Sequence, residues 1–134
     1  GQFVLSGETG AVEYAGELAL KKGAKRAVKL DVSGPFHSSL MQGPAEHFER
    51  FLEQFRFADP KYPVISNINS RLITSAEQVK MELVAQLTNP VDWIGNIQAL
   101  EQLGGTQLVQ LGPGSVLTGL TKRITKNLEL ISFA

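Results

Sequence analysis

The stretch SGPFHSSLM, residues 33–41, places His37 directly before an apolar helical pattern, and the chain has only one other histidine. A neutral imidazole accepts a proton on one ring nitrogen while the other keeps its own, so a histidine base needs an acceptor for that second N–H. The partial positive charge of a helix start also disfavours imidazolium. His37 is therefore a candidate general base. The alternative is an ordinary helix start, since Ser38 and Ser39 can cap the helix themselves.

The position of Pro90 predicts that the Gln86 carbonyl lacks its usual helical hydrogen-bond donor. In an α-helix the Gln86 carbonyl would accept a hydrogen bond from the N–H of residue 90, and proline has none. The residue before a proline is also biased away from helical geometry, so a helix should end here. Either water or a histidine N–H could satisfy this carbonyl, the latter in the role of Asp in a Ser-His-Asp triad. Sequence spacing alone does not bring residues 37 and 86 together.

Other chemical signals are weaker. LGPGS, residues 111–115, joins a predicted strand to a helix, but it matches neither G-x-G-x-x-G nor a Walker loop. Two sets of cationic residues could attract an acidic partner, but a solvated surface is the default interpretation of both. They are Lys21, Lys22, Lys25, Arg26 and Lys29, and Lys122, Arg123 and Lys126. Two histidines without cysteine match no metal-binding spacing, so we predict no metal site.

Bulk composition limits the class of protein. A chain of 134 residues with 43% hydrophobic content suits one domain or a piece of one. Thirteen basic and 13 acidic residues balance, which gives no global attraction to nucleic acid. Without cysteine, a membrane-length apolar run or a signal peptide, we expect a cytoplasmic protein with no membrane partner. The chain opens almost inside a predicted strand with no initiator Met, so we expect a piece of a longer protein.

Hydrophobic periodicity predicts strands that alternate with helices. Predicted strands cover 2–6, 24–32, 62–67, 107–111 and 128–133, and predicted helices cover 11–22, 40–55, 74–90, 90–103 and 115–127. Gly23 should cap the C-terminus of the first helix, and Gly43-Pro44 should kink or restart the second helix. Thr74 with Glu77, or Ser75 with Gln78, should cap the third. The alternation indicates an α/β fold with a largely parallel sheet.

Four motifs in order carry a family resemblance: SGPFHSSLM, PVISN, AQLTNPVDW and LGPGSVLTGLTKRI. Together with GAKRAVKLDVSGPFH upstream, they resemble the C-terminal part of the malonyl-CoA:acyl carrier protein transacylases of bacterial fatty acid synthesis. The resemblance covers essentially all 134 residues. It implies that residues 1–33 end an inserted ferredoxin-like subdomain, as its last strand-helix-strand. Residues 34–134 would be the C-terminal part of an α/β-hydrolase-like acyltransferase domain.

The resemblance also implies a ping-pong mechanism. A serine on a nucleophile elbow takes malonyl from coenzyme A and passes it to the phosphopantetheine thiol of acyl carrier protein; the coenzyme A thioester is the substrate and no cofactor is needed. His37 matches the catalytic histidine of the family, and Gln86 matches the residue whose main-chain carbonyl holds it. Phe36 matches a position where Phe goes with malonyl and Ser often with methylmalonyl. Val116 matches a residue near the acyl-thioester pocket.

The chain departs from the family in its nucleophile. No serine here lies in a G-x-S-x-G elbow, and the family's arginine for the malonyl carboxylate would lie upstream of residue 1. We therefore expect the missing N-terminal portion to supply both groups and the 134 residues alone to be inactive. Two alternatives stay open. One is a non-catalytic module that binds a carrier protein through Lys122, Arg123 and Lys126, and the other is a Ser-His hydrolase of acyl thioesters.

Overall fold

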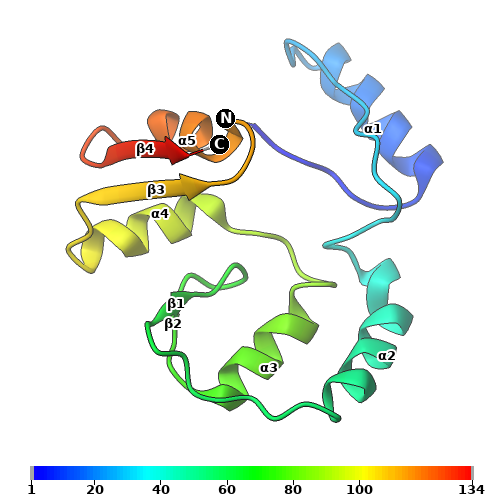
Figure 1. Ribbon diagram of the computed structural model, residues 1–134. Helices are drawn as coiled ribbons and strands as arrows, with labels where there is room; N and C mark the ends of the chain where they lie inside the picture. The colour runs from blue at the N-terminus through cyan, green and yellow to red at the C-terminus, as the bar shows by residue number, and fades with distance from the viewer. Residues whose placement is uncertain (1, 134) are drawn as a thin grey trace. The chain divides into compact units, whose positions relative to one another are not determined.

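The computed structural model describes residues 2–133, which form two compact units (Figure 1). The first unit combines Gly1–Arg56 with Leu83–Pro90, and the second combines Phe57–Glu82 with Val91–Ala134. The first unit therefore contains both the His37 segment and the segment that ends at Pro90. Among residues 2–133, no helix is long and apolar enough to cross a membrane.

The first unit is helical. Its regular elements are α1 (Thr9–Lys21), the 3-10 turn η1 (Ser39–Met41), α2 (Gln42–Leu52) and the end of α3 (Ala76–Ala85). Gly23 follows α1 with φ 97°, and its N–H donates to the Leu20 carbonyl at 3.0 Å, which confirms the predicted glycine cap. The predicted restart near Gly43-Pro44 is also confirmed, because η1 gives way to a new helix, α2, at Gln42.

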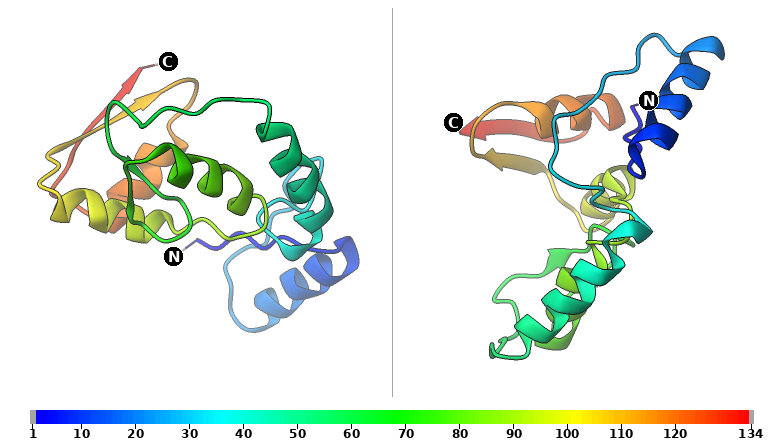
Figure 2. Two further views of the ribbon diagram at one scale, coloured as in Figure 1. Left: turned by 90° about the horizontal axis from the view of Figure 1, so that it is seen from below. Right: turned by 90° about the vertical axis from the view of Figure 1, so that its right-hand side faces the viewer.

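The second unit contains both strand pairs. Its elements are β1 (Val64–Ile65), β2 (Leu72–Ile73), most of α3, α4 (Trp93–Gln102), β3 (Gln107–Leu111), α5 (Val116–Ile124) and β4 (Glu129–Phe133). β1 and β2 pair antiparallel, whereas β3 and β4 pair parallel in the register Gln107↔Glu129 to Leu111↔Phe133. β3 and β4 lie side by side in every view (Figures 1 and 2). The predicted α/β class agrees with this mixture, but the described residues form two separate pairs and not one parallel sheet.

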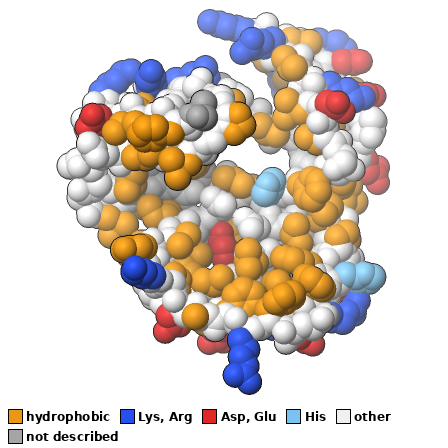
Figure 3. All heavy atoms as spheres, in the orientation of Figure 1, with side chains coloured by type: hydrophobic (Ala, Val, Ile, Leu, Met, Phe, Trp, Pro, Cys, Tyr) orange, Lys and Arg blue, Asp and Glu red, His pale blue; other side chains and the backbone are white. Residues whose placement is uncertain are grey.

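The two faces of the β3–β4 pair differ. α5 packs against both strands, and the Gln110 side chain and Leu128 are buried in this unit together with Ile97 of α4. On the other strand face, Val109, Leu111 and Phe133 stay 48%, 78% and 59% exposed. Figure 3 shows hydrophobic side chains gathered over β3 and β4. Parallel strands are normally covered on both faces, and the other elements of the second unit leave this face uncovered.

Two predicted strands are wrong for the described chain. Residues 2–6 and 24–32 flank α1 but form no strand. A strand exists only where a neighbouring backbone pairs with its N–H and C=O groups, and strand pairing within residues 2–133 is limited to β1–β2 and β3–β4. Val28 and Val32, which alternation would place on one side of the predicted strand, are 68% and 65% exposed. Of the strand-helix-strand expected in residues 1–33, the described part has only the helix.

The start of α3 is held by a capping box. The Ser75 hydroxyl accepts from the Gln78 N–H at 3.3 Å, and the Gln78 side-chain oxygen accepts from the Ser75 N–H at 3.3 Å. This confirms one of the two predicted capping pairs. Asp59, which the sequence analysis did not single out, adds a bond from the Ala76 N–H at 2.8 Å. The helix that ends beside His37 therefore has a defined first turn.

Candidate functional site

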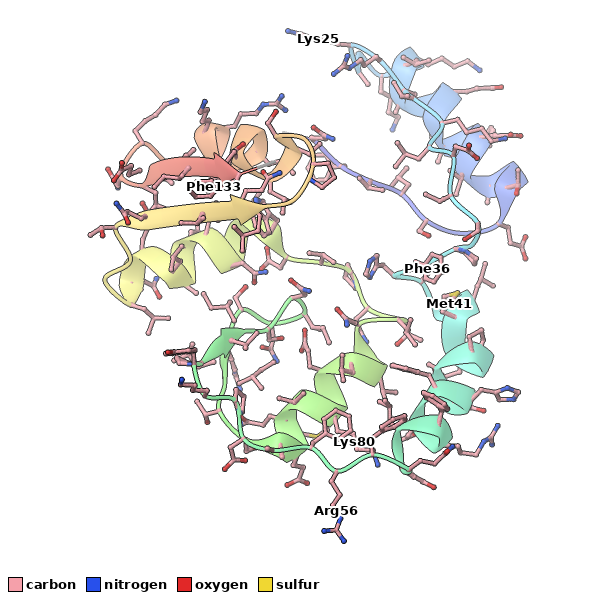
Figure 4. The ribbon with its side chains drawn as sticks, in the orientation of Figure 1. Lys25, Phe36, Met41, Arg56, Lys80 and Phe133 are labelled. Carbon is pink, nitrogen blue, oxygen red and sulfur yellow. The ribbon has the colours of Figure 1, made fainter. Side chains whose placement is uncertain are left out.

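His37 lies in a backbone conformation that side chains rarely adopt. Its φ is 63°, in the left-handed region, which costs a non-glycine residue about 1–3 kcal/mol at such sites. Its backbone N–H donates to the Leu87 carbonyl at 2.9 Å. The Ser38 hydroxyl donates to the Pro35 carbonyl at 2.6 Å and closes the turn. Figure 4 labels Phe36, which lies within this turn, and Met41, which follows it in η1.

The His37 ring is held by two backbone carbonyls. Nδ1 lies 2.8 Å from the Gln86 oxygen and 3.2 Å from the Asn89 oxygen. A carbonyl oxygen only accepts, so Nδ1 carries a proton in this arrangement, and in the neutral ring Nε2 then keeps its lone pair. The structure thus forms the contact between residues 37 and 86 that spacing alone did not predict. The ring has the tautomer of a general base.

The end of α3 explains why these carbonyls are available. The regular helix stops at Ala85, and the Asn89 N–H makes the last i-to-i−4 bond, to the Ala85 carbonyl at 3.1 Å. The next bond in the series would need an N–H at Pro90. His37 donates to carbonyls of this last turn instead, through Nδ1 and through its backbone N–H. The contacts of Leu87 and Asn89 with His37 were not predicted, because no local pattern marks them.

The other two predicted site residues lie apart in the chain. Phe36 directly precedes His37 in the first unit and is 41% exposed, with its ring close to Gly34. Val116 begins α5 in the second unit and is 69% exposed. The Gln110 side chain shapes the turn before Val116, since it donates to the Gly114 carbonyl at 2.9 Å and accepts from the Thr118 N–H at 3.0 Å.

A serine and a carboxylate also meet in the second unit. The Ser66 hydroxyl donates to Glu82 at 2.6 Å, and the Asn67 N–H donates to the same carboxylate at 2.7 Å. Ser66 is only 2% exposed, and its oxygen accepts from the N–H groups of Ile68 and Asn69 at 3.2 and 3.3 Å. The pair therefore builds the turn after β1. It does not present a nucleophile.

Comparisons with known proteins agree on one enzyme. No model of a protein family matched the chain. The chain is 42% identical over 132 residues to the malonyl CoA-acyl carrier protein transacylase of Bacillus subtilis, and 40% identical to that of Staphylococcus aureus. Each alignment covers 98% of this chain but only 42% and 43% of the relative. The chain therefore spans about two fifths of the length of the curated relatives it matches.

Solved structures give the same result. A malonyl-transacylase in complex with its type II PKS acyl-carrier protein matches with a TM-score of 0.90 and 42% identity, over 95% of this chain and 41% of that one. An acyl carrier protein S-malonyltransferase from Vibrio cholerae matches with a TM-score of 0.88 and 41% identity, over 95% and 42% of the two chains. At these identities the likeness covers sequence and fold together.

Proposed function

We propose that this chain is the C-terminal part of a malonyl-CoA:acyl carrier protein transacylase, with His37 as its general base and acid. One observation carries the proposal: His37 Nδ1 lies 2.8 Å from the Gln86 carbonyl, at the two positions that match the family's histidine and its main-chain partner. The alignment with transacylases over 98% of the chain supports it independently.

The proposed chemistry uses both ring nitrogens of His37. In the first half-reaction Nε2 takes the proton of the serine hydroxyl as its oxygen attacks the malonyl thioester carbonyl. The carbon–sulfur bond breaks, and the imidazolium gives its proton to the coenzyme A thiolate. In the second half-reaction the carrier thiol gives its proton to Nε2 and its sulfur attacks the malonyl ester carbonyl. The bond between the acyl carbon and the serine oxygen breaks, and the serine oxygen takes the proton back from the imidazolium. Throughout, the carbonyls of Gln86 and Asn89 hold Nδ1–H and stabilise the imidazolium.

The remaining groups come from outside this chain. The relatives are more than twice as long, and we place the serine nucleophile and the group for the malonyl carboxylate in the portion that this chain does not span. Phe36 is proposed to limit the size of the acyl group, and Val116 is proposed to lie near the acyl thioester. Residues 1–33 are proposed to complete a ferredoxin-like subdomain and residues 34–134 an α/β-hydrolase-like one, in a cytoplasmic enzyme that needs no cofactor.

The test is malonyl transfer by the complete protein that carries this chain. After incubation with malonyl-CoA, intact mass spectrometry should show one added malonyl group, and addition of acyl carrier protein should remove it. His37→Ala should slow ester formation by about 10²–10⁴-fold, the contribution of a positioned base. His47→Ala is the matched control, because His47 is exposed on α2, and this variant should keep the full rate.

The outcomes separate the three functions. Equal rates for the two histidine variants would remove His37 from the mechanism. An ester that water clears as fast without carrier protein would indicate a hydrolase. Binding of carrier protein without any ester would indicate the non-catalytic module. The 134-residue chain alone should gain no malonyl group.

A further inference from the structure

The side chain of Asn89 ties together the turn that holds His37. Its Nδ2 donates to the Ala85 carbonyl at 2.8 Å and to the Thr88 hydroxyl at 3.2 Å. The Thr88 hydroxyl donates to the same Ala85 carbonyl at 3.2 Å. Nδ2 donates in both contacts, so the Asn89 amide acts in this turn as a hydrogen-bond donor. Asn89 and Thr88 together close the chain back onto the last residue of α3.

The same turn carries the three carbonyls that face His37. The oxygens of Gln86 and Asn89 accept from Nδ1, and the oxygen of Leu87 accepts from the His37 backbone N–H. Their directions depend on the backbone angles of residues 86–89, which lie beyond the regular part of α3. Pro90 offers no N–H to continue the helical ladder. The Asn89 amide and the Thr88 hydroxyl are therefore the side-chain groups that bond this turn back to α3, and the Asn89 amide makes the shorter bond.

We propose that Asn89 is a positioning residue for the His37 base. Through its Nδ2 bond to the Ala85 carbonyl, it sets the direction of the Gln86 and Asn89 carbonyls and so keeps the proton on Nδ1. Without this bond the turn can relax, the two carbonyls leave Nδ1, and the ring spends part of its time with the proton on Nε2. In that tautomer Nε2 has no lone pair and cannot accept the serine proton. This inference rests on the proposed transacylase function.

The test compares Asn89→Asp with Asn69→Asp in the complete protein. Asn89→Asp keeps the size and shape of the side chain but replaces the donor by an acceptor that faces the Ala85 carbonyl. Asn69 is exposed, and its Oδ1 accepts from the Arg71 N–H at 3.0 Å, so an aspartate there keeps the bond while adding the same charge. Differences between the two variants therefore report the lost donor.

Two readouts separate positioning from folding and from function. Protonated and unprotonated ring nitrogens give distinct ¹⁵N signals, and those of His37 are assigned by their loss in His37→Ala. In the wild type we expect one protonated Nδ1 and one unprotonated Nε2. In Asn89→Asp we expect mixed tautomers and a kcat about tenfold lower, with KM for malonyl-CoA within about twofold. Asn69→Asp should match the wild type in both.

The ring signals and kcat of Asn89→Asp decide whether the inference stands. Unchanged ring signals and kcat in a folded Asn89→Asp protein would overturn the inference. If the ring signals change but the wild type transfers no malonyl, the positioning stands and the proposed function fails. Should Asn89→Asp not fold, Asn89→Ala decides, since it removes the Nδ2 donor to the Ala85 carbonyl without placing a charged acceptor opposite that carbonyl. This variant should show the same mixed tautomers and a smaller loss of kcat, and wild-type signals there would overturn the inference.

Discussion

Replacing Pro90 by alanine should weaken the hold on His37 without touching any side chain of the site. Pro90→Ala gives position 90 an amide N–H and relieves the bias that proline imposes on Asn89. The Asn89 N–H already bonds to the Ala85 carbonyl at 3.1 Å, so the new N–H falls on the next carbonyl in the helical series, that of Gln86. The Gln86 oxygen then has two competing donors, and one of them is His37 Nδ1.

The size of the effect follows from the two distances at Nδ1. Capture of the Gln86 oxygen removes the 2.8 Å partner and leaves the Asn89 oxygen at 3.2 Å. A hydrogen bond to a charged group contributes about 1.5–3 kcal/mol, and His37 is charged only after it has taken the proton. Loss of this hydrogen bond therefore raises the free energy of the transition state, in which the ring becomes charged, more than that of the ground state. At about 1.36 kcal/mol per factor of ten, it corresponds to a kcat/KM lowered roughly 10- to 150-fold.

The assay is the initial rate of malonyl transfer to acyl carrier protein by the complete protein. Gln86→Ala removes more side-chain atoms than Pro90→Ala but keeps the backbone carbonyl that contacts His37. It should therefore lose less activity than Pro90→Ala. Pro63→Ala, at an exposed proline before β1, controls for the general effect of the substitution. Hydrogen exchange at position 90 shows whether the new amide is bonded. A protected amide together with a wild-type rate would refute the reasoning, because the carbonyl would be captured at no cost to catalysis.

Two further predictions concern specificity and packing. Phe36→Ser in the complete protein should raise the ratio of methylmalonyl to malonyl transfer in a competition assay, since it removes a ring next to His37; an unchanged ratio would take Phe36 out of the acyl pocket. Gly95→Ala should lower the free energy of unfolding by about 1–3 kcal/mol in urea, because the new Cβ would overlap the Asp92 carboxylate and the Ser70 hydroxyl. In Gly119→Ala the new Cβ has no atom of residues 2–133 within 4 Å outside its own helix backbone, so this variant should be neutral or up to about 1 kcal/mol more stable. Equal losses of stability in the two variants would contradict the clash at Gly95.

Local rules predicted the elements whose cause is local. The strand at 107–111 agrees with β3 residue for residue, and the Ser75–Gln78 capping box and the glycine cap at Gly23 both form. Each depends on residues within about one helical turn or on simple alternation. β2, at Leu72–Ile73, was not predicted, because two residues are too few to show a period.

Features that depend on distant partners could not be predicted in this way. Residues 24–32 alternate as a strand should, but alternation does not supply the neighbouring strand that pairing needs. In the site, Pro90 identified the Gln86 carbonyl, because the missing N–H is fixed by chemistry. Its pairing with His37 spans 49 positions in sequence, and only the family resemblance suggested it. The left-handed backbone of His37 had no sequence signal at all.

The two irregular features of the site compensate each other. Pro90 leaves the last turn of α3 with carbonyls that the helix cannot satisfy, and the left-handed turn at His37 carries strain of about 1–3 kcal/mol. Hydrogen bonds of about 0.5–1.5 kcal/mol each, from the His37 N–H to Leu87 and from Nδ1 to Gln86 and Asn89, are of the size needed to offset that strain. A histidine in ordinary helical or extended geometry would direct its backbone N–H and its ring differently. The left-handed conformation therefore allows the backbone N–H and the ring of one residue to donate to carbonyls of the same turn. The proposed base is thereby oriented by backbone carbonyls. Apart from replacing His37 itself, the substitutions expected to disturb it most are therefore those at Pro90 and Asn89, which control the backbone, and the effect of replacing Gln86 should be smaller.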